Sequence, residues 1–312
     1  MRRVVCREFG PLENLVVEDA TSPEPRDGQV VIDVKAAGVN FVDALFVQGK
    51  YQIKPPTPFT PGGEVAGVTS NGKRVIASCG LGGFSEQIVF PEFGLYELPE
   101  NLSFGVGATL IQSYATGVFA LERRTHLNEG EWVLVLGAGG GVGRAAIDIS
   151  VAKGARVIGV ASTEEKRQLA IDAGAEATID TSEDIKTRAR EISDGGVDLV
   201  YDPVGGALAE PALRALKFGG RFVVIGFAAG EIPRLPTNQV LLNNRTIVGV
   251  DWGAWTMRNA MENRALVEQI IERCSDGTYH PVEPSAYPLE DVSKVLADLE
   301  NRKITGKAVL VP

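Results

Sequence analysis

The stretch Trp132-Val133-Leu134-Val135-Leu136-Gly137-Ala138-Gly139-Gly140-Gly141-Val142-Gly143 decides the fold class of this chain. After it come a helix-like segment, 144–153, and a second apolar run, 156–161. This order of strand, glycine turn, helix and strand is one βαβ unit of about thirty residues. Such a turn lets the backbone approach a pyrophosphate, and the helix N-terminus presents free N–H groups to it. The stretch therefore predicts a dinucleotide site.

The glycine pattern alone is a weak signal, because the usual G-x-G-x-x-G spacing appears here as Ala138-x-Gly140-x-x-Gly143. A tight turn that binds nothing is the alternative interpretation. The strand and helix patterns on both sides favour the dinucleotide site, since they fall where the motif requires them. The residues then expected to contact the cofactor are Ala138, Gly139, Gly140, Gly141, Val142 and Gly143.

Length and composition limit the possible functions. The chain has 312 residues, which predicts two domains, and a formal net charge of −9. An acidic chain argues against nucleic acid as a partner, since phosphate binding needs a basic face. No apolar run approaches the ~20 residues of a membrane span, and the N-terminus has no long apolar segment of the kind found in signal peptides. We expect a cytoplasmic protein that does not bind a membrane.

Cysteine and histidine are scarce. The three cysteines, Cys6, Cys79 and Cys274, are scattered and form no C-x-x-C pair, which favours a reducing compartment. Only two histidines are present, His126 and His280. These counts argue against a zinc site built from His and Cys ligands.

The patterning changes twice along the chain. Residues 1–118 begin with many short β-branched runs separated by Gly and Pro turns, which predicts a small barrel-like β domain ending in a helix. Residues 119–261 alternate strand and helix patterns, which predicts a parallel sheet with helices on both faces. Residues 262–312 contain two helices, an irregular stretch at 281–288 and a closing strand. We expect this tail to return to the first domain and complete it.

Several motifs, in this order, resemble the medium-chain dehydrogenase/reductase superfamily. The resemblance extends over almost the whole chain and is closest to the zinc-independent NADPH:quinone oxidoreductases. It implies an α/β protein with a GroES-like β-barrel domain and a Rossmann domain with a doubly wound parallel sheet. The motifs are Ala36-Ala37-Gly38-Val39-Asn40-Phe41-Val42-Asp43, Pro61-Gly62-Gly63-Glu64, Tyr114-Ala115-Thr116-Gly117, Asn128-Glu129-Gly130-Glu131 with the glycine turn, and Thr305-Gly306-Lys307.

Departures from the zinc-dependent branch also carry information. Where those relatives have a ligand Cys and a ligand His, this chain has Asn40 and Gly63, and it lacks their four-cysteine lobe. The resemblance therefore implies that no metal is bound. An alcohol oxidation that depends on a metal Lewis acid is excluded on the same grounds.

The end of the second βαβ strand favours NADPH over NADH. NAD sites usually place a carboxylate there, whereas this chain has Ser162 and then Lys166, a hydroxyl and a cation that suit a 2′-phosphate. Arg167 follows, and the whole segment could instead be a solvated helical turn. The resemblance adds contacts at Thr116, Gly226, Phe227, Val250, Asp251 and Trp252. Asp202 to Gly206 matches a family turn whose role could be structural, and Trp252 could equally well fill a core.

Asn40 and Tyr51 are the candidate catalytic residues, because the resemblance places them around the hydride acceptor. One hydrogen-bond donor to the acceptor oxygen can stabilise the charge that develops there. Both residues also have structural interpretations: Asn40 as a turn residue, and Tyr51 as an aromatic packed beside Pro55 and Pro56. Leu45-Phe46 stands where many relatives carry another Tyr, which leaves the acceptor open.

Three functions remain. The first is an NADPH-dependent reductase of small-molecule quinones or activated α,β-unsaturated carbonyls. The others are an enoyl-thioester reductase and a non-catalytic NADPH-binding redox sensor. Relatives of this length commonly form homodimers, and 246–250 could serve as the pairing edge strand.

Overall fold

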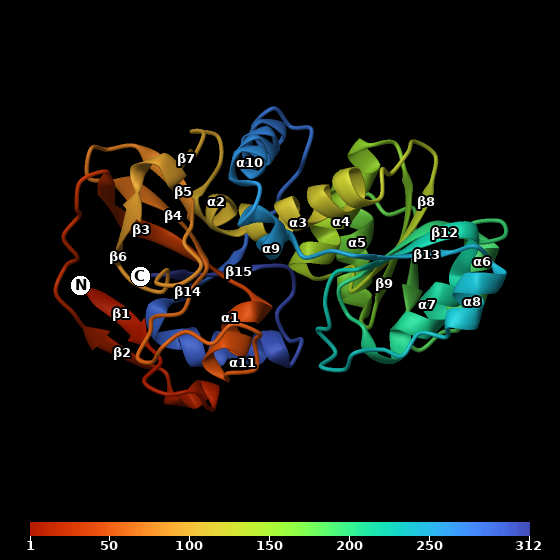
Figure 1. Cartoon of the computed structure of the whole chain (residues 1–312), viewed down its shortest axis with the longest axis horizontal. Coiled ribbons are helices and arrows are strands. Elements are labelled where there is room, and N and C mark those ends of the chain that lie inside the picture. Colours follow the sequence, from red (N-terminus) through yellow and green to blue (C-terminus); the bar gives the residue numbers. More distant parts are fainter. The chain divides into compact units, whose positions relative to one another are not determined.

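The computed structural model describes all residues, 1–312, and divides into two compact units. Unit 1 contains residues 1–112 and 281–312, and unit 2 contains residues 113–280. The predicted α/β fold class is confirmed: a β-rich unit is combined with a unit built on a six-stranded, all-parallel sheet (Figure 1).

Unit 1 is built from nine strands, three helices and short 3₁₀ turns. The strands are β1 Arg2–Val5, β2 Val16–Asp19, β3 Gln29–Val39, β4 Glu64–Thr69, β5 Arg74–Ser78, β6 Gln87–Pro91, β7 Tyr96–Glu97, β14 Ser285–Pro288 and β15 Ala308–Val311. The helices are α1 Phe41–Val47, α2 Phe104–Leu110 and α11 Val292–Glu300.

The main sheet of unit 1 is organised around β3. Its order is β14-β15-β3-β4-β5-β7, with β6 also paired to β3 and with β1 and β2 forming a separate ribbon. All pairs are antiparallel except β14 with β15. Valine and isoleucine at alternate positions of β3 point into a core that α11 covers, since Ile32, Val34 and Leu296 belong to one buried cluster. The closing strand of the chain therefore completes the sheet of unit 1.

Unit 2 alternates strand and helix. Its strands are β8 Trp132–Leu136, β9 Arg156–Ala161, β10 Ala177–Asp180, β11 Val197–Asp202, β12 Leu216–Val224 and β13 Thr246–Gly249. Its helices are α3 Thr116–Val118, α4 Gly141–Ala152, α5 Glu164–Asp172, α6 Ile185–Ile192, α7 Ala209–Ala215, α8 Thr237–Leu242, α9 Trp252–Thr256 and α10 Ala260–Ser275.

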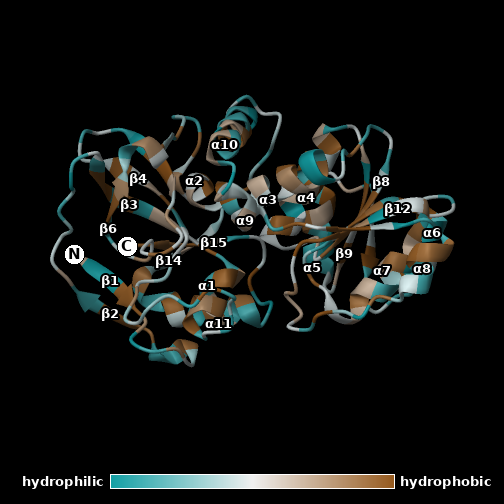
Figure 2. Ribbon diagram, in the orientation of Figure 1, coloured by the Kyte–Doolittle hydropathy of each residue, from teal (hydrophilic) through white to brown (hydrophobic).

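The sheet order in unit 2 is β10-β9-β8-β11-β12-β13. The chain first moves outward from β8 in one direction and then returns to build β11 on the other side. Right-handed crossovers consequently place α4 and α5 on one face and α6 and α7 on the other (Figure 1). The strands are the most apolar part of this unit, drawn largely brown in Figure 2. Every residue of β8 is buried, as expected for a central parallel strand.

Several boundaries differ from those expected. Residues 281–288 are not irregular throughout, because β14 adds a parallel strand to β15. The strand expected from Arg221 begins at Leu216, and the helix after the glycine turn begins at Gly141. Residues 113–118 and 262–280, expected in the first domain, lie in unit 2. The α10 helix is tied to that unit by Arg273, whose guanidinium donates to Glu122 at 2.9 Å.

A helical stretch at Phe104–Arg124 is long and apolar enough to span a membrane by composition, although no such run was expected from the sequence. It includes α2, α3 and two π-helical segments, Ile111–Ala115 and Phe119–Arg124. Ser103 caps its start by accepting the Val106 N–H at 3.0 Å. Within its most apolar window 83 % of the residues are buried, so this is a core helix.

Gly38 allows α2 to pack closely on β3, which gives a test of the unit 1 core. A Cβ at Gly38 would lie 2.0 Å from the Ala108 carbonyl oxygen and 2.9 Å from Glu64 Cγ. We expect Gly38→Ala to lower the free energy of unfolding by about 3 kcal/mol or more, because backbone must move to accept the methyl group. Urea unfolding followed by circular dichroism measures the effect.

Gly10→Ala is the matched control, since its nearest neighbour would be Asn14 Nδ2 at an ordinary 3.5 Å. A loss of stability in Gly38→Ala no larger than in this control would contradict the close approach of α2 and β3.

Candidate functional site

The glycine turn lies at the point where the order of the parallel strands reverses. It follows β8, which has β9 on one side and β11 on the other. In open α/β sheets this crevice, beyond the carboxyl ends of the strands, is where ligands bind. The turn therefore occupies the position that its sequence pattern predicts for a dinucleotide.

Each end of the turn depends on a missing side chain. Gly137 has φ of 63°, in the left-handed region. A Cβ on Gly143 would lie 2.3 Å from the Gly137 carbonyl oxygen, so only glycine lets α4 begin this close to β8. Gly140 precedes the helix, and the N–H groups of its first turn have no partner within the helix. The turn fits a pyrophosphate, because it combines a close-packed backbone with a helix N-terminus.

Lys166 lies directly against this turn. A Cβ on Gly139 would be 2.6 Å from the Lys166 Cβ, so the glycine makes room for the lysine stem. Thr163 caps α5 by accepting the Lys166 backbone N–H at 3.3 Å. Ser162, the residue after β9, is exposed. The predicted cation thus lies beside the turn, and the predicted hydroxyl directly follows β9.

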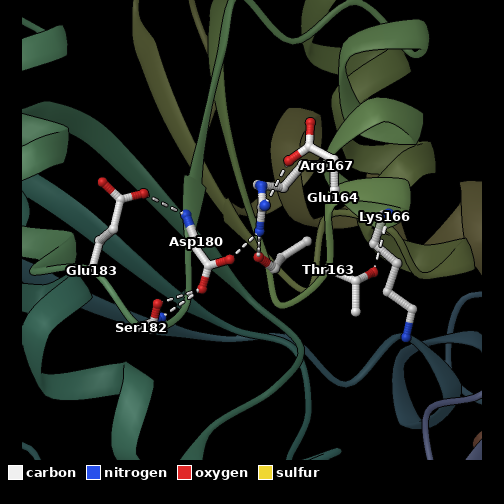
Figure 3. A network of polar contacts seen from close by, with 8 residues as sticks. Thr163, Glu164, Lys166, Arg167, Asp180, Ser182 and Glu183 are labelled. Atoms are coloured by element: carbon white, nitrogen blue, oxygen red, sulfur yellow. Dashed lines mark hydrogen bonds and ion pairs between the residues drawn. The ribbon is translucent and has the colours of Figure 1, made fainter.

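Arg167, next to Lys166, has a different role. Its guanidinium binds Asp180 at the end of β10 and Glu164 in its own helix, and it donates to the Ala161 carbonyl at 3.3 Å (Figure 3). Asp180 also accepts from Ser182, which is the main reason that its pKa is lowered. In Figure 3 the Lys166 side chain extends away from this network. The carboxylates near the end of β9 are therefore engaged by Arg167, whose role is structural.

The other predicted cofactor residues follow the carboxyl ends of further strands or lie in a buried helix. Gly226 and Phe227 follow β12, and Val250, Asp251 and Trp252 follow β13. Thr116 begins α3 and is 9 % exposed. The parallel sheet thus places the residues after β8, β9, β12 and β13 at one edge.

Asp202, Asp251 and Trp252 all make structural contacts. Asp202 accepts the N–H groups of Val204 and Gly205, both at 2.8 Å, so it shapes its own turn. Asp251 caps α9 by accepting the Ala254 N–H. Trp252 is buried and donates to Asn263 at 3.0 Å, which fixes the orientation of its indole ring.

In unit 1 the predicted residue Asn40 lies at the end of β3. Strands β4 and β15 flank β3 there: Gly38 pairs with Glu64, and Val39 pairs with Ala308. The register brings the first residue of β4 and the residue before β15 to either side of Asn40. Residues 40, 64 and 307, which are far apart in the sequence, meet at this point.

These three residues form a buried polar network. Asn40 Nδ2 donates to Glu64 Oε1 at 2.9 Å, and Lys307 Nζ donates to Asn40 Oδ1 at 2.5 Å. Lys307 is also 3.6 Å from Glu64 Oε1, and their side chains are only 15 % and 3 % exposed. The backbone N–H of Gln112 donates to the other Glu64 oxygen at 3.0 Å. Asn40 is therefore held by its partners and is more than a turn residue.

Asp43 completes this end of α1. It is fully buried, and its Oδ2 accepts the Asn40 backbone N–H at 2.8 Å. Burial raises the pKa of Asp43 to about 7, and the charge of Glu64 adds to the rise, while the Asn40 amide and Lys307 oppose it. This carboxyl tethers the residue that precedes the helix.

Tyr51 lies beyond the other end of α1. Its ring packs on Phe46 with centroids 4.7 Å apart, and its N–H donates to the Leu45 carbonyl at 3.3 Å. The expected packing partners of the structural interpretation were Pro55 and Pro56, but the aromatic partner is Phe46. Asn40 and Tyr51 thus flank one short helix.

Sequence reasoning missed the part played by Glu64 and Lys307. Both stood in motifs that were noticed, but nothing local in the sequence links them to Asn40. Cys79 is one of the three scattered cysteines. Its environment disfavours the thiolate, since burial raises its pKa to about 12. His280 donates its backbone N–H to Asp148 at 2.7 Å, consistent with a structural position.

Comparisons with known proteins agree with this architecture. Residues 26–100 match the family described as "Alcohol dehydrogenase GroES-like domain", and residues 141–270 match "Zinc-binding dehydrogenase". The chain is 38 % identical to a quinone oxidoreductase-like protein 2 homolog of Nematostella vectensis, over 99 % of this chain and 88 % of that protein. It belongs to the quinone oxidoreductase-like family of medium-chain dehydrogenases/reductases.

Solved structures of this quinone oxidoreductase-like family superpose over the full chain. The Escherichia coli quinone oxidoreductase complexed with NADPH has a TM-score of 0.90 at 27 % identity and is covered completely. The Thermus thermophilus quinone oxidoreductase, also solved as a complex with NADPH, has a TM-score of 0.86 at 32 % identity with both chains fully covered. The resemblance stated from the motifs is confirmed.

One matching family is described as zinc-binding. Among residues 1–312 no group of three or more His, Cys, Asp and Glu side chains is placed to hold a metal ion. By the resemblance stated from the motifs, Asn40 and Gly63 are expected where zinc-dependent relatives have their ligands. That the protein binds no zinc stays a prediction.

The raised pKa of Asp43 makes the stability of the protein depend on pH. Between pH 4 and 7 the unfolded chain has lost this proton while the folded protein keeps it, so the contribution of Asp43 to stability falls as pH rises. The limit is about 1.4 kcal/mol per pH unit. Asp43→Asn cannot ionise, so the stability of the wild type relative to this variant should fall from pH 5 to pH 7.5. Urea unfolding of both proteins across that range measures it, and a constant difference would contradict the assignment.

Proposed function

We propose that this protein is an NADPH-dependent oxidoreductase that reduces small-molecule quinones or activated α,β-unsaturated carbonyls without a metal. One observation carries the proposal: the side chain of Lys166 packs on Gly139 in the glycine turn. This turn lies where the order of the parallel strands reverses. It combines a pyrophosphate cradle with a cation at the end of β9, where an NAD site would have a carboxylate.

Each group of predicted cofactor residues would bind a different part of NADPH. The turn from Ala138 to Gly143 would bind the pyrophosphate, and Ser162 with Lys166 would bind the 2′-phosphate. Thr116 and the residues after β12 and β13 would line the nicotinamide, namely Gly226, Phe227, Val250, Asp251 and Trp252. NADPH supplies the hydride when bound, and the protein supplies position and polarity.

The acceptor side would use hydrogen bonds in place of a metal. A quinone or enone spreads the incoming negative charge onto oxygen, so one or two donors suffice to stabilise it. Asn40 and Tyr51 carry an amide and a hydroxyl that could serve. The related enzymes named above are quinone oxidoreductases, which supports this class of acceptor.

An enoyl-thioester reductase is the second candidate, and a non-catalytic NADPH sensor is the third. The buried network around Asn40 favours an enzyme, because a sensor has no need of a polar acceptor site that is held so firmly. Comparing the rates of NADPH oxidation with a quinone and with an enoyl thioester decides between these two acceptors.

Lys166 tests the cofactor assignment. Lys166→Ala should raise the Michaelis constant for NADPH by about 10- to 100-fold, since a charge-assisted contact to the 2′-phosphate is lost. The Michaelis constant for NADH should change little. Initial rates measured at 340 nm with each cofactor give both values.

Lys186→Ala, on the exposed first turn of α6, is the control for a general change of charge. Equal effects of Lys166→Ala on NADPH and NADH would remove Lys166 from the 2′-phosphate site.

Turnover with a panel of acceptors tests the reaction. We expect NADPH oxidation with 1,4-benzoquinone and with an enal, and little with crotonyl-CoA, in a preparation whose metal analysis shows no stoichiometric zinc. Tight NADPH binding without turnover of any acceptor would support the sensor. One zinc per chain would overturn the metal-free mechanism.

We also propose that the protein is a cytoplasmic homodimer. Strand β13 is an edge of the parallel sheet, and Ile247 within it is 40 % exposed. An uncovered edge strand is suited to pair with a second copy.

Ile247→Lys should shift the protein to a monomer, because a lysine on an edge strand opposes strand pairing. Light scattering after size-exclusion chromatography measures the mass. Phe93→Lys, at an 84 % exposed position in unit 1, is the control and should leave the dimer intact. A dimer that survives Ile247→Lys unchanged would point to another interface.

A further inference from the structure

The side-chain amide of Asn40 is held between two opposite charges. Its oxygen accepts from the Lys307 ammonium at 2.5 Å, and its nitrogen donates to the Glu64 carboxylate at 2.9 Å. All three side chains are largely buried. The contacts hold the amide on both sides, in surroundings from which most water is excluded.

The chemistry of the two partners determines which way the amide faces. An ammonium group can only donate and a carboxylate can only accept, so the oxygen must face Lys307 and the nitrogen must face Glu64. The nitrogen carries a second N–H besides the one given to Glu64. That N–H is left to bind a ligand oxygen.

The charges also change the strength of that donor. The Lys307 ammonium on the amide oxygen draws electron density from the nitrogen, and this effect is strong where the dielectric constant is low. Glu64 in turn is held by Lys307 and by the Gln112 N–H, so it cannot turn away from Asn40. The result is an oriented and polarised donor.

We propose that Lys307 and Glu64 are positioning residues: both orient the Asn40 amide, and Lys307 also polarises it, so that its second N–H donates to the oxygen of the hydride acceptor. This rests on the proposed function. Asn40 would contact the substrate, whereas Lys307 and Glu64 would act only through Asn40.

The reaction balances without a further reactant. Bound NADPH would supply a hydride to a carbon of the acceptor and leave as NADP⁺, and an electron pair of the acceptor would move onto its oxygen. That oxygen is stabilised by the Asn40 N–H and takes a proton from solvent water. Asn40 keeps both of its N–H hydrogens throughout.

A double-mutant cycle on the full-length protein tests this role. Lys307→Met should lower kcat with 1,4-benzoquinone by about tenfold while the Michaelis constant for NADPH changes little. In an Asn40→Ala background the same change should cost no further rate, because the residue through which Lys307 acts is gone. An equal loss in both backgrounds would overturn the proposal. The pair Lys307→Met and Tyr51→Phe should instead show independent effects on kcat.

Two further variants keep the test valid if Lys307→Met folds poorly. Lys307→Arg retains a cation and should recover most of the lost kcat. The double variant Glu64→Gln/Lys307→Met removes both charges, so no carboxylate is left buried alone, and it still offers an oxygen to Asn40. Its kcat should also fall about tenfold; wild-type kcat in this folded variant would overturn the proposal.

A readout that does not need activity separates this inference from the proposed function. In protein labelled with ¹⁵N at asparagine side chains, the Asn40 amide signals can be assigned by their loss in Asn40→Asp. They should shift and exchange faster with solvent in Lys307→Met. Unchanged signals would overturn the proposal that Lys307 holds the Asn40 amide. If the wild-type protein reduces no acceptor but Lys307→Met still shifts these signals, the proposed reaction is refuted. The proposal that Lys307 and Glu64 hold the Asn40 amide would then still stand.

Discussion

The pairing of the last strand of the chain with β3 is the constraint on which unit 1 depends. Antiparallel hydrogen bonds between β15 and β3 set Ala308 opposite Val39, while β4 sets Glu64 opposite Gly38 on the other side. A shift of one residue in either pairing would send the side chains to the opposite face of the sheet. The register therefore decides that a cation and a carboxylate meet at Asn40. The close approach of α2 at Gly38 supports the same end of β3.

In unit 2 the corresponding constraint is steric. Glycine at 143 lets a helix begin against the carbonyl of residue 137, and glycine at 139 lets the stem of Lys166 lie on the turn. Lys166 and Arg167 are neighbours in sequence but point in different directions, because successive helical residues are about 100° apart. One lies beside the turn, and the other joins α5 to β10 through Asp180. The helix thus directs Lys166 toward the turn and Arg167 toward Asp180.

Much of this organisation could be predicted from the sequence. The βαβ unit around Gly137 was evident because glycine spacing and apolar runs are local signals. The position of Lys166 near the end of β9 was also predictable, because it follows the apolar run 156–161 by only a few residues. The parallel strand β14 was not predicted, since its Ser285-Ala286-Tyr287-Pro288 sequence has little strand character and its place is due to pairing with β15. The hydrogen bond from Trp252 to Asn263 was not predicted either, because it depends on how α9 and α10 pack together.

The sequence by itself determined the two-part architecture, the glycine turn, the family and the absence of zinc-ligand residues at 40 and 63. These features depend on residue type and spacing within short segments. Only the tertiary structure decided that Glu64 and Lys307 hold the amide of Asn40, and that Arg167 is engaged by Asp180. Such contacts join residues that are distant in the chain, and they exist only because strand register and helix packing bring those side chains within hydrogen-bonding distance.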